Sequence, residues 1–260
     1  MTKHHSTVEV LGCSGSIGIR GEGTTSFLID DDLLIDAGSG LNDLEFSRLE
    51  RINHLVLTHS HLDHICSLPF LVDTVGVGRK QILKIYGLKH TIDALKECIF
   101  NERIWPDFTR IPSLDNPVME YVVIEPHSTL RFGDRTIQTV PVTHTVPALG
   151  IILDTPTGSW CFSGDTHQTD ELYQVLNTRE GLKYFFLEAA FPNKEKWLAD
   201  LAKHLCPSLV FDELTKLQSD CEVWISHLKP REFRQIQSEL LAHGSPRQLQ
   251  LLAARMIFHV

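Results

Sequence analysis

The sequence contains no CxxC pair, no long apolar run and no excess of basic residues. Its six cysteines are widely scattered, which argues against a thiolate zinc site and favours buried, reduced thiols over a disulfide framework. No stretch supplies the roughly 18 apolar residues of a membrane-spanning helix, and the start MTKHHSTVEV lacks the apolar core of a signal peptide. These absences predict a cytoplasmic protein without membrane contact.

The charge balance is acidic, because 24 lysines and arginines stand against 33 aspartates and glutamates, a formal net charge of -9. Such a chain has no general basic field, so long polyanions such as RNA or duplex DNA are not expected as partners. A small anionic substrate needs only a local cation, so the net charge does not exclude a substrate of this class.

Neither a linker nor a low-complexity tract divides the chain, and no repeat is visible at the level of individual residues. At 260 residues, 42% of them hydrophobic and 22% charged, the chain can bury a full core. We therefore predict one domain over residues 1–260.

Short β-rich runs, separated by turn residues, alternate with segments of helical spacing. The predicted strands are 8–11, 25–29, 33–35, 54–58, 82–86, 121–124, 136–141, 150–154, 160–163, 184–188 and 222–226. The predicted helices are 62–75, 91–100, 194–205, 207–216 and 232–243, with a proline-punctuated loop at 101–117. Two β-rich blocks with peripheral helices indicate two packed sheets covered by helices, a four-layer α/β arrangement.

The most concentrated chemistry is the hexapeptide HSHLDH, residues 59–64. An extended strand directly before it sends His59 and His61 to one side, since residues two apart in a strand point the same way. A helix that begins directly afterwards carries Asp63 and His64 on its first turn, aimed differently. Chance crowding of this order is improbable, so one turn is expected to serve two neighbouring metal ions.

Isolated histidine and aspartate residues follow three later strands: His144 in PVTHTVPALG, Asp165 in FSGDTH and His227 in ISHLKP. Residues just beyond a strand end lie at the rim of a sheet, where functional groups are common. A lone histidine is more often a surface or hydrogen-bonded core residue, and Gly-Asp is ordinary turn chemistry. Position and residue type nevertheless agree with a metal site that includes the hexapeptide.

With these residues in view, the sequence resembles the metallo-β-lactamase-fold hydrolases. Their ordered motifs, a strand-end Asp, HxHxDH, His, Asp and His, fall here at Asp36, residues 59–64, His144, Asp165 and His227. The resemblance implies an αββα sandwich of two mixed β-sheets with helices outside. It also implies that Asp36 orients the histidine loop.

The resemblance assigns the ligands to two metal ions. One ion would be held by His59, His61 and His144, the other by Asp63, His64 and His227, and Asp165 would bridge both. An acidic residue at the second histidine position marks the di-iron oxidoreductases of this fold, so His61 indicates hydrolysis. Nitrogen and oxygen ligands without cysteine favour Zn²⁺, and Mn²⁺ or Fe²⁺ also fits.

Within the fold, the segments HSHLDHI, PVTHTVPALG, SGDT, FFLEAAFPNK, KHLCP, DELTKL and ISHLKP are similar to those of the class II cyclic-nucleotide phosphodiesterases. The resemblance implies a small cyclic-nucleotide substrate, cAMP or cGMP, and by family analogy a homodimer. Ser67 stands where glycine is usual and His167 where a smaller residue is common, which indicates a different pocket floor.

The expected reaction is attack on phosphorus by a hydroxide that bridges the two ions and is oriented by Asp63, with loss of the ribose 3′-oxygen to give a 5′-nucleotide. His204 is our candidate proton donor or phosphate contact, with Glu188 as its orienting partner. The alternative is that His204 lies on a helix surface and Glu188 is an ordinary strand-end charge. Lys229 is either a phosphate contact or a solvated lysine.

Two other functions stay open. A different hydrolase on the same site, an RNA 3′-processing enzyme of the tRNase Z kind or another esterase, shares most of these motifs. Only 20 residues separate His144 from Asp165, which leaves no room for the tRNA-gripping arm of bacterial tRNase Z. A metal-binding protein without catalysis is the third reading, and the complete set of ligands argues against it.

Overall fold

The computed structural model describes residues 5–18, 21–76, 78–243 and 247–260. Within these residues the chain forms two mixed seven-stranded sheets and a small hairpin of β6 (Pro112–Ser113) and β7 (Asn116–Pro117). In spatial order the first sheet contains β16 (Ile257–His259), β1 (Thr7–Gly12), β2 (Ser26–Ile29), β3 (Leu33–Ile35), β4 (His54–Val56), β5 (Leu83–Leu88) and β8 (Met119–Ile124). The second contains β15 (Leu249–Leu251), β14 (Glu222–Ser226), β13 (Leu182–Glu188), β12 (Gly158–Phe162), β11 (Ala148–Thr155), β10 (Arg135–Val142) and β9 (Thr129–Phe132).

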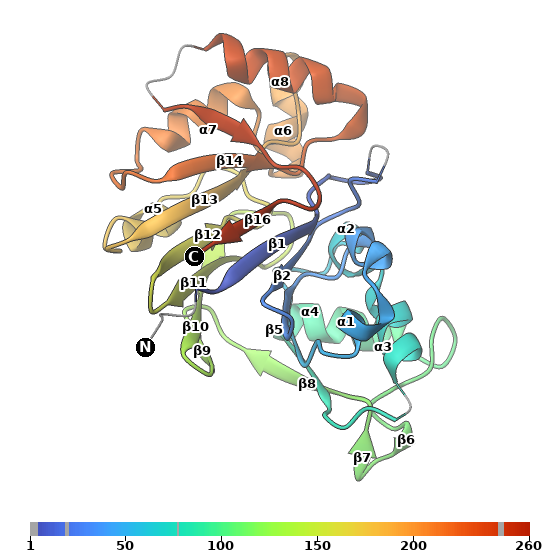
Figure 1. Cartoon of the computed structure of the whole chain (residues 1–260). Helices are drawn as coiled ribbons and strands as arrows, with labels where there is room; N and C mark the ends of the chain where they lie inside the picture. The colour runs from blue at the N-terminus through green and yellow to red at the C-terminus, as the bar shows by residue number, and fades with distance from the viewer. Residues whose placement is uncertain (1–4, 19–20, 77, 244–246) are drawn as a thin grey trace.

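Helices cover the outer face of each sheet (Figure 1). On the first sheet lie α1 (Phe46–Leu49), α2 (Leu62–Ile65), α3 (Leu68–Val75) and α4 (Lys89–Ala94). On the second lie α5 (Glu171–Leu176), α6 (Lys196–Ala202), α7 (Pro207–Leu214) and α8 (Phe233–Ala242). Short turns η1 (Ser39–Asp43), η2 (Leu95–Ile99), η3 (Asn193–Glu195) and η4 (Pro230–Glu232) complete the described elements. The expected four-layer αββα sandwich of two mixed sheets is therefore confirmed.

The two sheets share one topology, although the sequence shows no residue-level repeat. From β16 to β3 neighbouring strands are antiparallel, and from β3 to β8 they are parallel. From β9 to β12 neighbouring strands are again antiparallel, and from β12 to β15 parallel. Because parallel strands end at a common edge, each sheet gathers several loops on one rim.

Three apolar layers hold the sandwich together. Between the sheets, Phe27 packs edge-on against Phe162 and Trp160, with ring centroids 4.9 and 5.7 Å apart, and Phe186 joins them. All four rings are fully buried. Burial of each such ring stabilises the fold by about 2 to 3 kcal/mol, so this layer fixes how the two sheets face each other.

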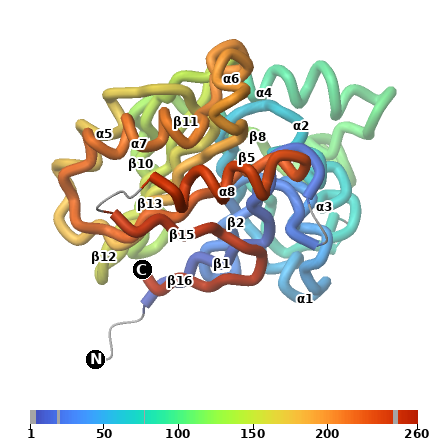
Figure 2. The backbone as a smooth tube through the Cα atoms, turned by 90° about the horizontal axis from the view of Figure 1, so that it is seen from above, coloured from blue at the N-terminus to red at the C-terminus, as the bar shows by residue number. Residues whose placement is uncertain are grey.

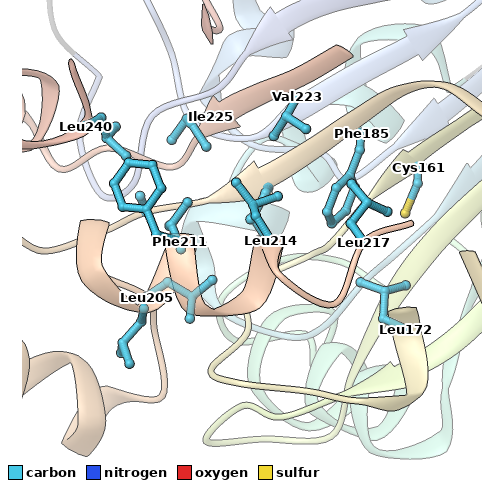
Figure 3. Close-up of a cluster of buried hydrophobic side chains, with 14 of the residues drawn as sticks. Cys161, Leu172, Phe185, Leu205, Phe211, Leu214, Leu217, Val223, Ile225 and Leu240 are labelled. Atoms are coloured by element: carbon cyan, nitrogen blue, oxygen red, sulfur yellow. The ribbon is translucent and has the colours of Figure 1, made fainter. Parts of the chain in front are cut away.

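The outer layers pack helices onto each sheet. Figure 3 shows α7 side chains such as Phe211 and Leu214 directed at Val223 and Ile225 of β14. Seen from above, α7 and α8 lie over the strands β13 to β15 (Figure 2). A separate cluster joins α3 and α4 to the first sheet. None of the described helices has the length and apolar character needed to cross a membrane.

The expected helix 62–75 is two helices, α2 and α3, with a break at Cys66 and Ser67. The amide of Ser67 donates to the carbonyl of Ala37 (2.9 Å) instead of continuing the helix, and Pro69 has no amide to offer. The prediction of one helix was wrong because a tertiary contact and a proline interrupt its ladder.

Other boundaries differ by a few residues. The strand expected at 54–58 ends at Val56, the helix expected at 91–100 begins at Lys89 and ends in a π-helical turn, and the helix expected at 194–205 ends at Ala202. The short elements α5, β9, β15 and β16 were not expected. All six cysteines are free, as expected. The expectation of buried thiols holds for Cys13, Cys161 and Cys206, whereas Cys66 and Cys221 are partly exposed and Cys98 is exposed.

Candidate metal centre

Loops from both sheets meet at the shared rim and bring together all the candidate ligands. Two sets have donor atoms that lie within 4.8 Å of one another: His59, His61, His144 and Asp165 in one, and Asp63, His64 and His227 in the other. The hexapeptide follows β4, and the three later residues follow β10, β12 and β14. The structure therefore assembles the sets in the grouping that the resemblance implies.

A buried hydrogen-bond network fixes the hexapeptide. Asp36, at the end of β3, accepts hydrogen bonds from the amide and hydroxyl of Thr58, both at 2.8 Å, and from Nδ1 of His64 at 2.7 Å. The Thr58 hydroxyl in turn lies 3.0 Å from Nδ1 of His59. Since Asp36 is fully buried and holds Nδ1 of His64, it directs Nε2 of that ring at the site.

In the first set, Nε2 of His144 lies 3.1 Å from Nδ1 of His61, and Nε2 of His59 lies 3.6 Å from Oδ2 of Asp165. The Nδ1–H of His144 donates to the backbone carbonyl of Lys203 at 3.0 Å. This bond fixes the tautomer, because a carbonyl only accepts, and leaves a lone pair on Nε2 that faces His61. Two ring nitrogens this close can share a cation.

In the second set, Nε2 of His64 lies 3.2 Å from Oδ2 of Asp165, and Nδ1 of His227 lies 3.2 Å from Oδ1 of the same carboxylate. Asp63 lies 3.8 Å from Nε2 of His227 and accepts a hydrogen bond from the amide of Ser16 at 3.0 Å. Asp165 thus lies next to residues of both sets: its Oδ2 faces His59 of the first set and His64 of the second, and its Oδ1 faces His227.

Several of these donors are buried without a hydrogen-bond partner among the described residues: His59 Nε2, His64 Nε2, Asp165 Oδ1 and His227 Nδ1. Unpaired buried polar atoms are costly and rare, and here they converge on one place. Nitrogen and carboxylate oxygen are ligands of divalent transition metals. The donor set therefore fits divalent cations.

Burial and mutual contact shift the pKa values of the donors. Burial lowers the pKa of His59 well below its ordinary value, which favours the neutral, ligating form. Burial by itself raises the pKa of Asp165, but His227 and His64 outweigh it and hold that pKa well below the ordinary value. Burial by itself lowers the pKa of His64, but the charges of Asp165 and Asp36 outweigh it and raise that pKa well above the ordinary value. An ionised Asp165 and a neutral His59 are the forms that bind a metal.

His204 and Glu188 are paired beside the two sets. Nδ1 of His204 lies 2.7 Å from Oε1 of Glu188, which is fully buried at the end of β13. Glu188 also accepts hydrogen bonds from the amides of Thr166 and Leu205, at 2.9 and 3.2 Å. His204 is 7% exposed, so the alternative of a surface histidine is wrong.

The His204 ring stacks on His227 with centroids 5.2 Å apart, and its donor atom groups with those of Asp165 and His227. Burial lowers the pKa of His204, but the charge and hydrogen bond of Glu188 raise it, and the net shift is upward. His204 therefore combines contact with the centre and a tendency to keep its proton.

Other residues singled out in the sequence lie nearby or elsewhere. The Lys229 ammonium lies 4.1 Å from the centroid of Phe191, so it is held against a ring instead of being freely solvated. His167 turns toward Asp200 of α6, with a 3.0 Å contact, and Ser67 is buried at the start of α3. The buried Glu213 of the DELTKL segment pairs with Lys216 at 2.7 Å.

Sequence reasoning missed three supports of the centre. Thr58 links Asp36 to His59, the Ser16 amide holds Asp63, and the Lys203 carbonyl holds His144. Thr58 could have been identified from the sequence, because it lies directly before the hexapeptide. The other two act through backbone atoms, which residue types do not reveal.

The family model that matches this chain is that of the class-II cAMP phosphodiesterases, over residues 43–147. A probable 3′,5′-cyclic-nucleotide phosphodiesterase of Yersinia pestis is 28% identical over 86% of this chain and 78% of its own length. Ribonuclease Z of Pyrococcus abyssi is 31% identical over 53% of this chain and 41% of its own length.

Solved structures agree on the fold. Yeast PDE1 covers 98% of this chain and 99% of its own, with a TM-score of 0.83 and 18% identity. The metallo-β-lactamase-fold protein YhfI of Bacillus subtilis has the same coverage and identity, with a TM-score of 0.78. The expected resemblance is therefore confirmed: the chain has the metallo-β-lactamase fold, and its sequence is similar to those of the class-II cAMP phosphodiesterases.

Proposed function

We propose that this protein is a dinuclear-metal phosphodiesterase that hydrolyses 3′,5′-cyclic nucleotides, cAMP or cGMP, to 5′-nucleotides. The observation that carries the proposal is the convergence of two ligand sets on Asp165 beside the paired His204 and Glu188. The match to the class-II family and to the Yersinia phosphodiesterase supports the substrate class.

His59, His61, His144 and Asp165 would hold one ion, and Asp63, His64, His227 and Asp165 the other. Two divalent ions, Zn²⁺ before Mn²⁺ or Fe²⁺, would activate water near neutral pH and offset the charge of the phosphodiester. The number of ions and their identity are part of this proposal.

Asp63 orients the attacking water. Its Oδ2 accepts a hydrogen bond from the Ser16 amide, and its side chain is 23% exposed, so the carboxylate reaches the open side of the centre. A carboxylate in this position accepts a hydrogen bond from water and directs the oxygen lone pair at phosphorus.

His204 supplies the proton that the leaving group needs. Its Nδ1–H is held by Glu188, so a proton on Nε2 faces the centre. As the water oxygen bonds to phosphorus, Asp63 takes one of the water protons, the bond from phosphorus to the ribose 3′-oxygen breaks, and that oxygen takes the Nε2 proton. The upward shift of the His204 pKa keeps this proton available near neutral pH.

RNA 3′-processing is the second candidate, favoured by the match to ribonuclease Z. Against it, the interval from His144 to Asp165 is occupied by strands β11 and β12 of the second sheet. An arm for tRNA cannot be built from residues that form the core of the sandwich. We keep a cytoplasmic location, a homodimer and the lack of a nucleic-acid polymer partner as parts of the main proposal.

The test is an assay of metal-reconstituted protein on cAMP, cGMP, bis-p-nitrophenyl phosphate and precursor tRNA, with metal content measured on the same sample. Hydrolysis of a cyclic nucleotide to the 5′-nucleotide is expected. Cleavage of tRNA without hydrolysis of any cyclic nucleotide would contradict the proposal. Two bound metals with no turnover of any substrate would favour a metal-binding protein without catalysis.

A further inference from the structure

A hollow of about 470 Å³ opens beside Asp63. Its lining is Ser16, Ile17, Thr24, Ser39, Leu62, Asp63 and Cys66. Its volume falls in the range of small-molecule sites. Because Asp63 belongs to both, the hollow adjoins the candidate metal centre.

Two large aliphatic side chains in its lining are exposed to solvent. Ile17 is 82% exposed and Leu62 is 66% exposed. They come from separate segments, the loop after β1 and the first residue of α2. Exposed apolar side chains that meet at the mouth of a charged site are available to contact an apolar part of a ligand.

The loop that carries Ile17 is held against the centre. The amide of Ser16 donates to Asp63, and a side chain at Gly15 would lie 2.8 Å from the His227 imidazole. The amide of Gly15 donates to the carbonyl of Leu228 at 3.3 Å. These contacts, one and two residues before Ile17, hold the backbone of this loop beside the metal ligands.

The polar part of the lining offers hydrogen-bond donors. Thr24 and Ser39 are paired reciprocally: the Thr24 amide donates to the Ser39 hydroxyl (2.9 Å) and the Ser39 amide donates to the Thr24 hydroxyl (2.7 Å). Both hydroxyl oxygens act as acceptors in this pair, so each keeps its own hydrogen to donate. Cys66 adds a partly exposed thiol near Thr24.

We propose that this hollow binds the nucleobase of the cyclic nucleotide, with Ile17 and Leu62 against the ring faces and the Thr24 and Ser39 hydroxyls toward acceptor atoms on its edge. The inference rests on the proposed function. A nucleobase is a flat, mostly apolar ring with acceptors along its edge, and this is the chemistry that the lining complements. The base would sit next to Asp63 while the phosphate occupies the centre.

The test separates base binding from phosphate chemistry. In metal-reconstituted Ile17→Ser and Leu62→Ser, the KM for cyclic nucleotide is expected to rise about tenfold, as for loss of apolar contact in a pocket. For bis-p-nitrophenyl phosphate, which has no nucleobase, kcat/KM should stay within about twofold of wild type. Ile104→Ser is the matched control, since Ile104 is 64% exposed and does not line this hollow.

Trp197, 66% exposed on α6, is the competing apolar surface, and Trp197→Ser tests it. A rise in the KM for cyclic nucleotide in this variant, with none in Ile17→Ser or Leu62→Ser, would overturn the proposal. So would equal losses on both substrates. If the wild-type protein hydrolyses no cyclic nucleotide, the proposed function itself fails, a result distinct from an unchanged KM in active variants.

A second measurement does not depend on turnover. Iodoacetamide labelling, followed by peptide mass spectrometry, should show that 5′-AMP protects Cys66 in the metal-reconstituted protein. Ribose 5-phosphate, which lacks the base, should protect it less. The exposed Cys98 is the internal control, because it lies on η2, outside the hollow. Equal protection by both compounds would contradict base binding here.

Discussion

The two sheets repeat one order of strand directions, yet they contribute to the centre in different ways. The first sheet contributes its ligands from one turn, residues 59–64, which is braced locally by Asp36. The second contributes His144, Asp165 and His227 from the ends of three strands. Equal topology thus supports unequal chemistry: one half offers a preformed cluster, and the other depends on how distant segments pack.

The largest effect is expected where the two halves meet, at Asp165. Asp165→Ala removes the only described carboxylate that lies beside both ligand sets, so we expect loss of both metals and a fall in kcat of about a thousandfold or more. Metal analysis and cyclic-nucleotide turnover on the same sample measure this. Wild-type metal content and rate in this variant would show that the proposed centre is wrong.

His204→Ala tests the second half without removing a ligand of either set. We expect kcat for cyclic nucleotide to fall about 10²- to 10⁴-fold because the leaving alkoxide loses its proton donor. The loss should be much smaller for bis-p-nitrophenyl phosphate, whose p-nitrophenolate leaves without protonation. Metal content is the control, and its loss together with activity would make His204 a ligand instead of a donor.

Asp36→Asn tests the local brace of the first half. The amide cannot accept from the Thr58 amide, the Thr58 hydroxyl and His64 in the same geometry, so His64 loses its fixed tautomer. Metal affinity should fall about 10- to 100-fold, with activity restored at high metal concentration. Metal titration against a competing chelator measures the change. Unchanged affinity would mean that the hexapeptide needs no brace.

Glu188→Gln should move the pH profile. The charge of Glu188 raises the pKa of His204 against the effect of burial, so its removal lowers that pKa. Since the donor must be protonated, activity is lost as pH rises through the pKa, and the alkaline limb of kcat should move to lower pH. Thermal unfolding is the control for stability. If the alkaline limb of the kcat profile does not move, Glu188 has no part in proton donation by His204.

The smallest effect is expected at Lys203, whose backbone braces His144. Lys203 has a φ of 57°, in the left-handed region that suits glycine. Lys203→Val should destabilise the fold by about 1 to 2 kcal/mol and weaken metal binding, whereas Lys203→Gly should do neither. Urea unfolding and metal titration give the two values. Equal behaviour of both variants would show that the backbone conformation there is unimportant.

The parts of the fold and site that were predictable are those that depend on local pattern. The residues of HSHLDH are contiguous, so the sequence alone reveals this cluster. The strands β3 and β14 have the bounds that their composition predicts. The break between α2 and α3 was not predictable, because it depends on the Ser67 amide reaching Ala37, 30 residues away in the chain. The Lys203 carbonyl is a similar case, since its role comes from the backbone and not from the lysine side chain.

Because the ligands of the centre come from both sheets, an ion bound there would act as a clamp across the seam of the sandwich. A chain that has folded only its first sheet would present the hexapeptide alone, which is a weak and incomplete chelator. Full affinity would arise only after the second sheet has docked, so metal capture is expected late in folding and should report on completion of the native state. Removal of the metal by a chelator would then weaken the coupling between the two sheets before it weakens the packing within either sheet.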